Sequence, residues 1–140
     1  MKRKSSWLTF WALVGVFVIV ICVYLIPMAR ESLLGPALLL GSGAAFLLLG
    51  AALIYFTIKE KVRGWVKRFL LITGASAVGI PISVVLHNVI YGLFIHFFGA
   101  DFWDRVGLSD EPVFFVIAVF ICPVAFLIGT IGSIVLRVKR

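Results

Sequence analysis

Residues 37–68 read ALLLGSGAAFLLLGAALIYFTIKEKVRGWVKR, and the change of character within this stretch decides the fold. Its first part, residues 37–58, is apolar and carries no charged side chain, whereas the next ten residues contain five lysines and arginines. About 20 apolar residues are enough for an α-helix to cross the hydrocarbon core of a bilayer. The stretch therefore predicts a membrane-spanning helix that ends in a basic segment outside the bilayer.

The rest of the chain has the same organisation. Of the 140 residues, 63% are hydrophobic and 14% are charged, whereas a soluble domain carries about 25% charged residues. Four apolar segments reach spanning length, at residues 7–29, 33–58, 69–98 and 113–136. We therefore expect an all-α polytopic membrane protein, a four-transmembrane-helix bundle that forms a single membrane domain over residues 1–140.

The positions of lysine and arginine predict the orientation of this bundle. Eleven of the thirteen basic residues lie at the N-terminus, in the 59–68 linker or at the C-terminus, three regions that share one side when there are four spans. Arg30 and Arg105 lie on the other side with five of the six acids, four of them in the external loop 99–112. The positive-inside rule then predicts an N-in/C-in, multi-pass protein in the cytoplasmic membrane of a prokaryote. This orientation accounts for the net charge of +7, so we expect no nucleic acid as a partner.

The basic linker has a pattern of its own. Val62, Trp65, Val66 and Phe69 follow helical spacing, and the lysines and arginines occupy the other faces. This pattern predicts a short amphipathic turn lying on anionic lipids of the inner leaflet. The alternative is a docking patch for an acidic cytoplasmic partner.

Small residues repeat every four positions in the second and fourth spans. Ala37, Gly41 and Ala45 form one such stripe, and Ala125, Gly129 and Ser133 form another. Helices associate in lipid through close van der Waals approach, which small side chains permit. We expect helix packing at Gly41, Ala45, Gly79, Gly129 and Ser133.

The third span carries the most polar stretch within the apolar segments. Ser83, His87 and Tyr91 follow one another at four-residue spacing, with Asn88 beside them. His87 lies near mid-span, so we expect a neutral imidazole that is hydrogen-bonded to a neighbouring polar group such as Asn88, Tyr91 or Thr130. The alternative is that these four side chains line a polar pocket for a lipid headgroup, a quinone or a protein partner.

Several kinds of chemistry are not expected. His96 lies about 13 Å along the helix from His87 and on its opposite face, so the two cannot share a metal or haem. The spans contain no acidic residue that could orient His87 in a catalytic triad or carry a proton in an antiporter. Cys22 and Cys122 both lie within spans and form no C-x-x-C pair. The sequence therefore predicts no catalytic residue, no metal site and no cofactor.

The external loop and two prolines suggest local features. Asp101 is expected to cap a short turn that stops at Gly107, and Ser109 or Asp110 to cap the fourth span. Pro81 and Pro123 each remove a backbone donor inside a span, which predicts a kink in both helices.

The second half of the chain, HNVIYGLFI followed by DEPVFFVIAVFICPVAFLIGTIGSIVL, resembles small uncharacterised four-helix integral membrane proteins of prokaryotes. The resemblance covers about the last 70 residues and implies no catalytic activity. We expect a non-catalytic accessory, assembly or regulatory subunit that acts through helix packing with a protein partner or as a homo-oligomer. The alternatives are a small oligomeric transporter or channel with a path lined by the third span, and a quinone- or lipid-binding subunit.

Overall fold

The computed structural model describes residues 5–31 and 35–139, and over these residues the chain forms only helices, turns and irregular segments. The long helices are α1 (Ser5–Leu25), α3 (Gly35–Lys59), α4 (Gly64–Phe98) and a fourth built from α6 (Pro112–Val116), the π-helical η1 (Ile117–Ile121) and α7 (Cys122–Val138). Two short helices, α2 (Pro27–Glu31) and α5 (Phe102–Arg105), lie in the connections.

The prediction of four helices long and apolar enough to span a membrane is confirmed. Their bounds differ from the predicted ones by a few residues at most ends. The first predicted residues of the second span, 33 and 34, lie outside the described residues, as do the cations Lys2, Arg3, Lys4 and Arg140.

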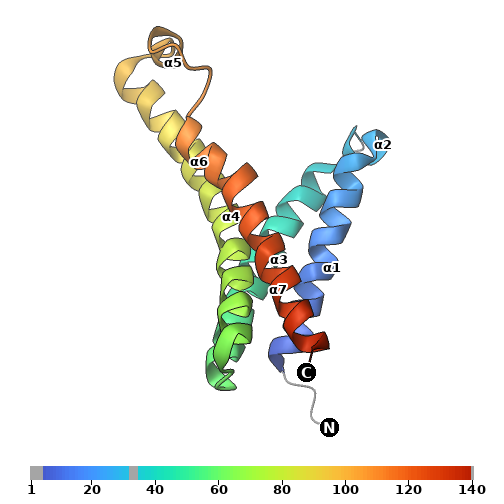
Figure 1. Ribbon diagram of the computed structural model, residues 1–140. Helices are drawn as coiled ribbons and strands as arrows, with labels where there is room; N and C mark the ends of the chain where they lie inside the picture. The colour runs from blue at the N-terminus through green and yellow to red at the C-terminus, as the bar shows by residue number, and fades with distance from the viewer. Residues whose placement is uncertain (1–4, 32–34, 140) are drawn as a thin grey trace.

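The four long helices lie together at one end of the molecule and diverge towards the other (Figure 1). The start of α1 and the end of α7 lie at the packed end, which we call the terminal end (Figure 1). At the opposite end, the loop end, α1 and α3 with α2 lean away from α4 and α6 (Figure 1). The buried apolar core draws on all four long helices: Phe10, Leu13, Phe46, Leu53, Val66, Leu70, Ala77 and Phe126.

Glycines allow close approaches between helices. A Cβ added to Gly50 of α3 would lie 2.8 Å from the Gly74 carbonyl oxygen of α4, and one added to Gly129 of α7 would lie 2.8 Å from the Thr73 backbone nitrogen. Neither contact could be relieved by moving a side chain, because the atoms met are backbone. The crossings α3–α4 and α4–α7 therefore depend on residues without a side chain.

Three phenylalanines connect the pair of helices α1 and α3 to the pair formed by α4 and the fourth long helix. Phe17 of α1 stacks on Phe126 of α7 with ring centroids 4.6 Å apart, and Phe46 of α3 meets Phe126 edge-on at 6.0 Å. Stacked and edge-on pairs are the arrangements that the charge distribution of aromatic rings favours.

The two prolines have different surroundings. The α-helix runs unbroken from Gly64 to Phe98 through Pro81. In the fourth helix the turn before Pro123, residues 117–121, is π-helical. A proline cannot donate to the carbonyl four residues earlier, so a local change of hydrogen-bonding pattern before Pro123 has a physical cause.

The basic linker was predicted to form a separate short amphipathic turn, but its second half belongs to a long helix. Helix α4 already begins at Gly64, so Trp65 to Arg68 form its first turn. The connection itself is tight, with positive φ angles of 50° at Lys61 and 71° at Gly64. Within it, the Glu60 carboxylate accepts hydrogen bonds from the hydroxyl and the backbone N–H of Ser6. The first residues of α1 are thereby tied to the α3–α4 turn.

Candidate functional site

His87 lies on α4 beside the start of α6 and contacts two acidic residues that precede that helix. Its Nδ1 atom is 3.1 Å from the backbone carbonyl oxygen of Glu111 and 3.3 Å from Oε2 of the same residue. Its Nε2 atom is 3.3 Å from Oδ2 of Asp110. We call His87, Asp110 and Glu111 the His87 cluster.

Glu111 also caps the helix that follows it. Its Oε1 atom accepts a hydrogen bond from the Val113 N–H at 2.7 Å, and its Oε2 atom accepts one from the Phe114 N–H at 3.0 Å. The carboxylate thus caps the N-terminus of α6, where backbone donors have no partner within the helix and negative charge is favourable. Pro112 occupies the first helical turn, where its missing N–H costs nothing.

Burial differs sharply within the cluster. The side chain of Glu111 is 4% exposed and that of His87 is 16% exposed, whereas that of Asp110 is 50% exposed. Asp110 also accepts a hydrogen bond from the Glu111 N–H at 2.7 Å. The cluster is therefore buried on the Glu111 side and open to the surroundings on the Asp110 side.

The predicted partners of His87 were wrong. The Asn88 amide donates to the Val84 carbonyl of its own helix at 2.8 Å, and the Tyr91 ring stacks on Trp103 of α5. The Thr130 hydroxyl has no partner among the described residues. No carboxylate was expected near His87, because the spans contain none, but loop 99–111 folds back and brings Asp110 and Glu111 to its ring.

The predicted pocket residues are therefore not brought together as one site. Ser83 is buried one turn before His87, whereas Asn88 is exposed. Tyr91 belongs to an aromatic contact between α4 and the loop, in which the Trp103 indole N–H donates to the Tyr91 carbonyl at 3.4 Å.

The loop acids also differ from the predicted caps. Glu111, and neither Ser109 nor Asp110, caps the fourth helix. Asp101 does not cap α5 through its side chain, and instead pairs with Arg105 at 3.4 Å. Gly107 does end this turn, with a φ of 75°.

Buried hydroxyl groups continue along the bundle from the His87 cluster towards the terminal end. On α4, Thr73, Ser76 and Ser83 are buried and lie on the same helix face as His87. The Thr73 hydroxyl donates to the Phe69 carbonyl. Three further buried hydroxyls have no hydrogen-bond partner among residues 5–31 and 35–139: Thr57, Thr130 and Ser133.

The residues expected to pack helices occupy two different surroundings. Gly129 and Ser133 lie against the neighbouring helices, and a Cβ on Gly79 would be 2.8 Å from the Cys122 sulfur. A Cβ on Gly41 would meet no described atom within 4 Å outside its own surroundings in α3. Gly41 is therefore not a packing contact within the chain, because its face of α3 borders a groove.

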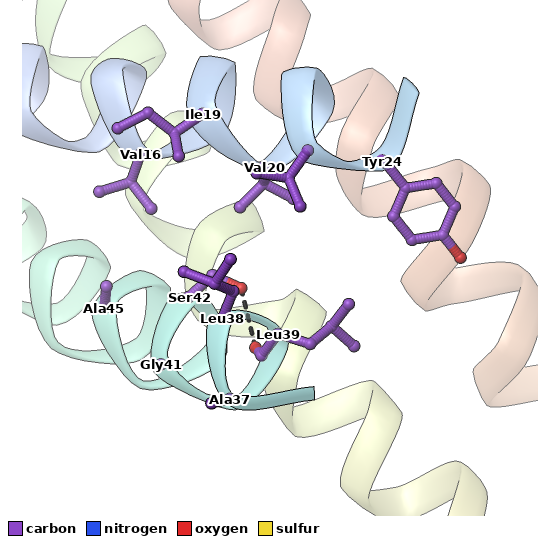
Figure 2. Close-up of a pocket in the computed structure, with 11 residues that line it drawn as sticks. Val16, Ile19, Val20, Tyr24, Ala37, Leu38, Leu39, Gly41, Ser42 and Ala45 are labelled. Carbon is purple, nitrogen blue, oxygen red and sulfur yellow. Dashed lines mark hydrogen bonds between the residues drawn. The ribbon is translucent and has the colours of Figure 1, made fainter. Parts of the chain in front are cut away.

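That groove lies between α1 and α3 and encloses about 240 Å³. Figure 2 shows Val16 and Val20 pointing from α1 towards α3, with Gly41 and Ala45 on the facing helix. The Ser42 hydroxyl, which also borders the groove, donates to the Leu39 carbonyl of its own helix. The lining is accordingly almost wholly apolar.

Cations and aromatic rings pair at the terminal end. The Arg137 guanidinium lies 4.0 Å from the centre of the Trp7 ring, Arg68 lies 4.7 Å from Trp65, and Lys59 lies 5.2 Å from Tyr55. Such pairs hold a positive charge next to an amphipathic ring.

Comparison with known proteins gives no assignment: no protein-family model, curated protein or solved structure matches the chain.

Proposed function

We propose that this chain is a non-catalytic, multi-pass protein of a prokaryotic cytoplasmic membrane that acts as an accessory, assembly or regulatory subunit. It binds a transmembrane helix of a protein partner through the halves of α1 and α3 that lie nearer the loop end. The observation that carries this proposal is the divergence of the two helix pairs, which leaves the groove between α1 and α3 uncovered by α4 and α7 (Figure 1).

The shape of the groove supports a helix as the occupant. One wall, from α3, carries Ala37, Gly41 and Ala45 at four-residue spacing, and the other carries the branched side chains Val16 and Val20. Close approach along a row of small residues is the ordinary means of helix association in lipid. The proposal therefore assigns the small-residue stripe of α3 to contact with another protein.

Photocrosslinking tests this proposal. A photoreactive amino acid at Leu39, which borders the groove and is 57% exposed, should form an adduct with one membrane protein in intact membranes. The same group at Val124 of α7, 55% exposed, should form adducts with lipid only. Identical adducts at both positions would contradict the proposal.

A variant that fills the groove sharpens the test. Gly41→Leu should abolish the protein adduct at position 39 without unfolding the chain, because its new side chain enters open space. Gly15→Leu on α1 is the matched control, since it also enters open space but Gly15 does not border the groove. The proposal fails if the adduct persists in Gly41→Leu.

The proposed orientation places both termini in the cytoplasm, and the distribution of basic residues supports it. In a background with Cys22 and Cys122 replaced by alanine, a cysteine at Ser109 should react with an impermeant thiol reagent in intact cells, and one at Arg63 should not. Both positions are exposed in the structure, so a reversed pattern would reverse the orientation.

We further propose that anionic lipids contact the 59–68 segment. Its cations and the Arg68–Trp65 pair lie at the terminal end, where the cytoplasmic leaflet would be. Replacing Lys61, Arg63, Lys67 and Arg68 by glutamine should remove the stabilisation that anionic lipid gives over zwitterionic lipid in nanodiscs. An unchanged difference between the two lipids would exclude this contact.

A second candidate function is a small oligomeric transporter. The observation that favours it is the row of buried hydroxyls between the His87 cluster and the terminal end, three of them without a partner in the described chain. Proton or ion flux into proteoliposomes that Ser133→Ala slows would support this candidate, and the absence of flux would exclude it.

A further inference from the structure

The His87 cluster contains more hydrogen-bond acceptors than a neutral histidine can serve. A backbone carbonyl only accepts, so Nδ1, which lies 3.1 Å from the Glu111 carbonyl oxygen, must carry a hydrogen atom. A neutral imidazole has only one N–H. Its Nε2 atom would then carry a lone pair beside the ionised Asp110 carboxylate, whose Oδ2 is 3.3 Å away.

The close contact between Nε2 and Asp110 is favourable only when the cluster holds one additional proton, on Nε2 or on the Asp110 carboxyl. We propose that His87, Asp110 and Glu111 form a binding site for a single proton taken from the loop end, and that this proton fastens α6 to α4. His87 then contacts two consecutive residues of the loop, donating from Nδ1 to Glu111 and forming an ion pair with Asp110.

The side chains described around the cluster do not compete with its three residues for this proton. The neighbouring ring on the α6 side is Phe115, which is apolar. Tyr91, one turn further along α4, stacks on Trp103, and the loop charges Asp101 and Arg105 pair with each other. Asp110 is half exposed, so the proton exchanges with the surroundings on its side of the cluster.

Loss of the proton should loosen the start of α6. Asp110 would lose its positively charged neighbour and lie beside a lone pair instead, while the same side chain accepts a hydrogen bond from the Glu111 N–H. Movement of Asp110 would therefore disturb Glu111, whose carboxylate caps Val113 and Phe114. The contact between α6 and α4 should therefore weaken as the pH is raised and the cluster gives up its proton.

Hydrogen exchange of the full chain in nanodiscs measures directly how well the cap protects the first amides of α6. The protection factors of the Val113 and Phe114 amides, which divide out the intrinsic effect of pH on exchange, should fall about tenfold between about pH 5 and pH 8, the size of one charge-assisted hydrogen bond. The amides of Leu70 to Thr73 in the core of α4 serve as an internal reference and should not change.

Two variants separate this proposal from a general effect of pH. In Asp110→Asn the side-chain amide can donate to an unprotonated Nε2, so the cap should stay protected at both pH values. Asp104→Asn removes an exposed acid of the same loop that takes no part in the described cluster, and should keep the tenfold response. Equal protection at both pH values in the unmodified chain, or an unchanged response in Asp110→Asn, would overturn the proposal.

Discussion

The terminal end and the loop end of the molecule are held together by different kinds of interaction. At the terminal end, glycines allow α3 and α7 to approach the backbone of α4, and buried apolar side chains such as Leu13, Leu53 and Leu70 form the core. At the loop end, α4 and α6 are joined by a polar cluster, and α1 and α3 lean away from them (Figure 1). Shape should therefore control stability at the first end, and charge at the second.

The largest effect is expected from changing shape at the terminal end. Gly129→Leu would place a side chain against the backbone of Thr73 and Phe69. Because backbone cannot move aside as a side chain can, we expect a loss of about 3 kcal/mol or more in stability. Thermal unfolding in detergent measures this loss. Gly41→Leu, on a helix face with open space, is the matched control and should unfold within a few degrees of the unmodified chain.

A smaller effect is expected from changing charge at the loop end. Glu111→Ala removes the acceptor for two backbone N–H groups and one partner of His87. The expected loss is about 2 kcal/mol, the upper range for a helix cap. Glu111→Gln keeps one carbonyl oxygen for the cap and should lose about half as much. A loss in Glu111→Ala as large as that in Gly129→Leu would contradict the distinction between the two ends.

The smallest expected difference compares one side-chain hydrogen bond from each end. Ser6→Ala removes a buried donor to Glu60 and should cost about 1 kcal/mol. Asn88→Ala removes an exposed amide that bonds only to its own helix, and should change stability by less than about 0.5 kcal/mol. Thermal unfolding of both variants under one set of conditions gives the comparison, and a greater loss for Asn88→Ala would reverse it.

The overall architecture could be predicted because it depends on the length of apolar segments. Four runs of about 20 or more apolar residues leave few alternatives to four long helices. The small-residue pattern was less informative. It correctly predicted Gly129 as a helix contact, but it pointed to Gly41 and missed Gly50. Four-residue spacing shows that residues share a helix face, but it does not show which neighbouring helix that face meets.

The candidate site could not be predicted from spacing in the chain. His87 and Glu111 are 24 positions apart, and they meet only because α4 continues beyond His87 and loop 99–111 returns alongside it. The order Glu111–Pro112 before an apolar run did contain a signal for a capping acid. The depth at which this cap would lie against α4 depends on tertiary packing.

The contact between Ser6 and Glu60 has a consequence for how the chain is assembled during its synthesis. It joins residues 54 positions apart, and Glu60 follows directly after α3. Helices α1 and α3 are connected by the chain at the loop end, and this contact closes the same pair at the terminal end. Both partners precede α4 and α7 in the chain, so both leave the ribosome before those two helices do. The first two long helices can thus be fastened as a closed hairpin, against which the later pair is then added.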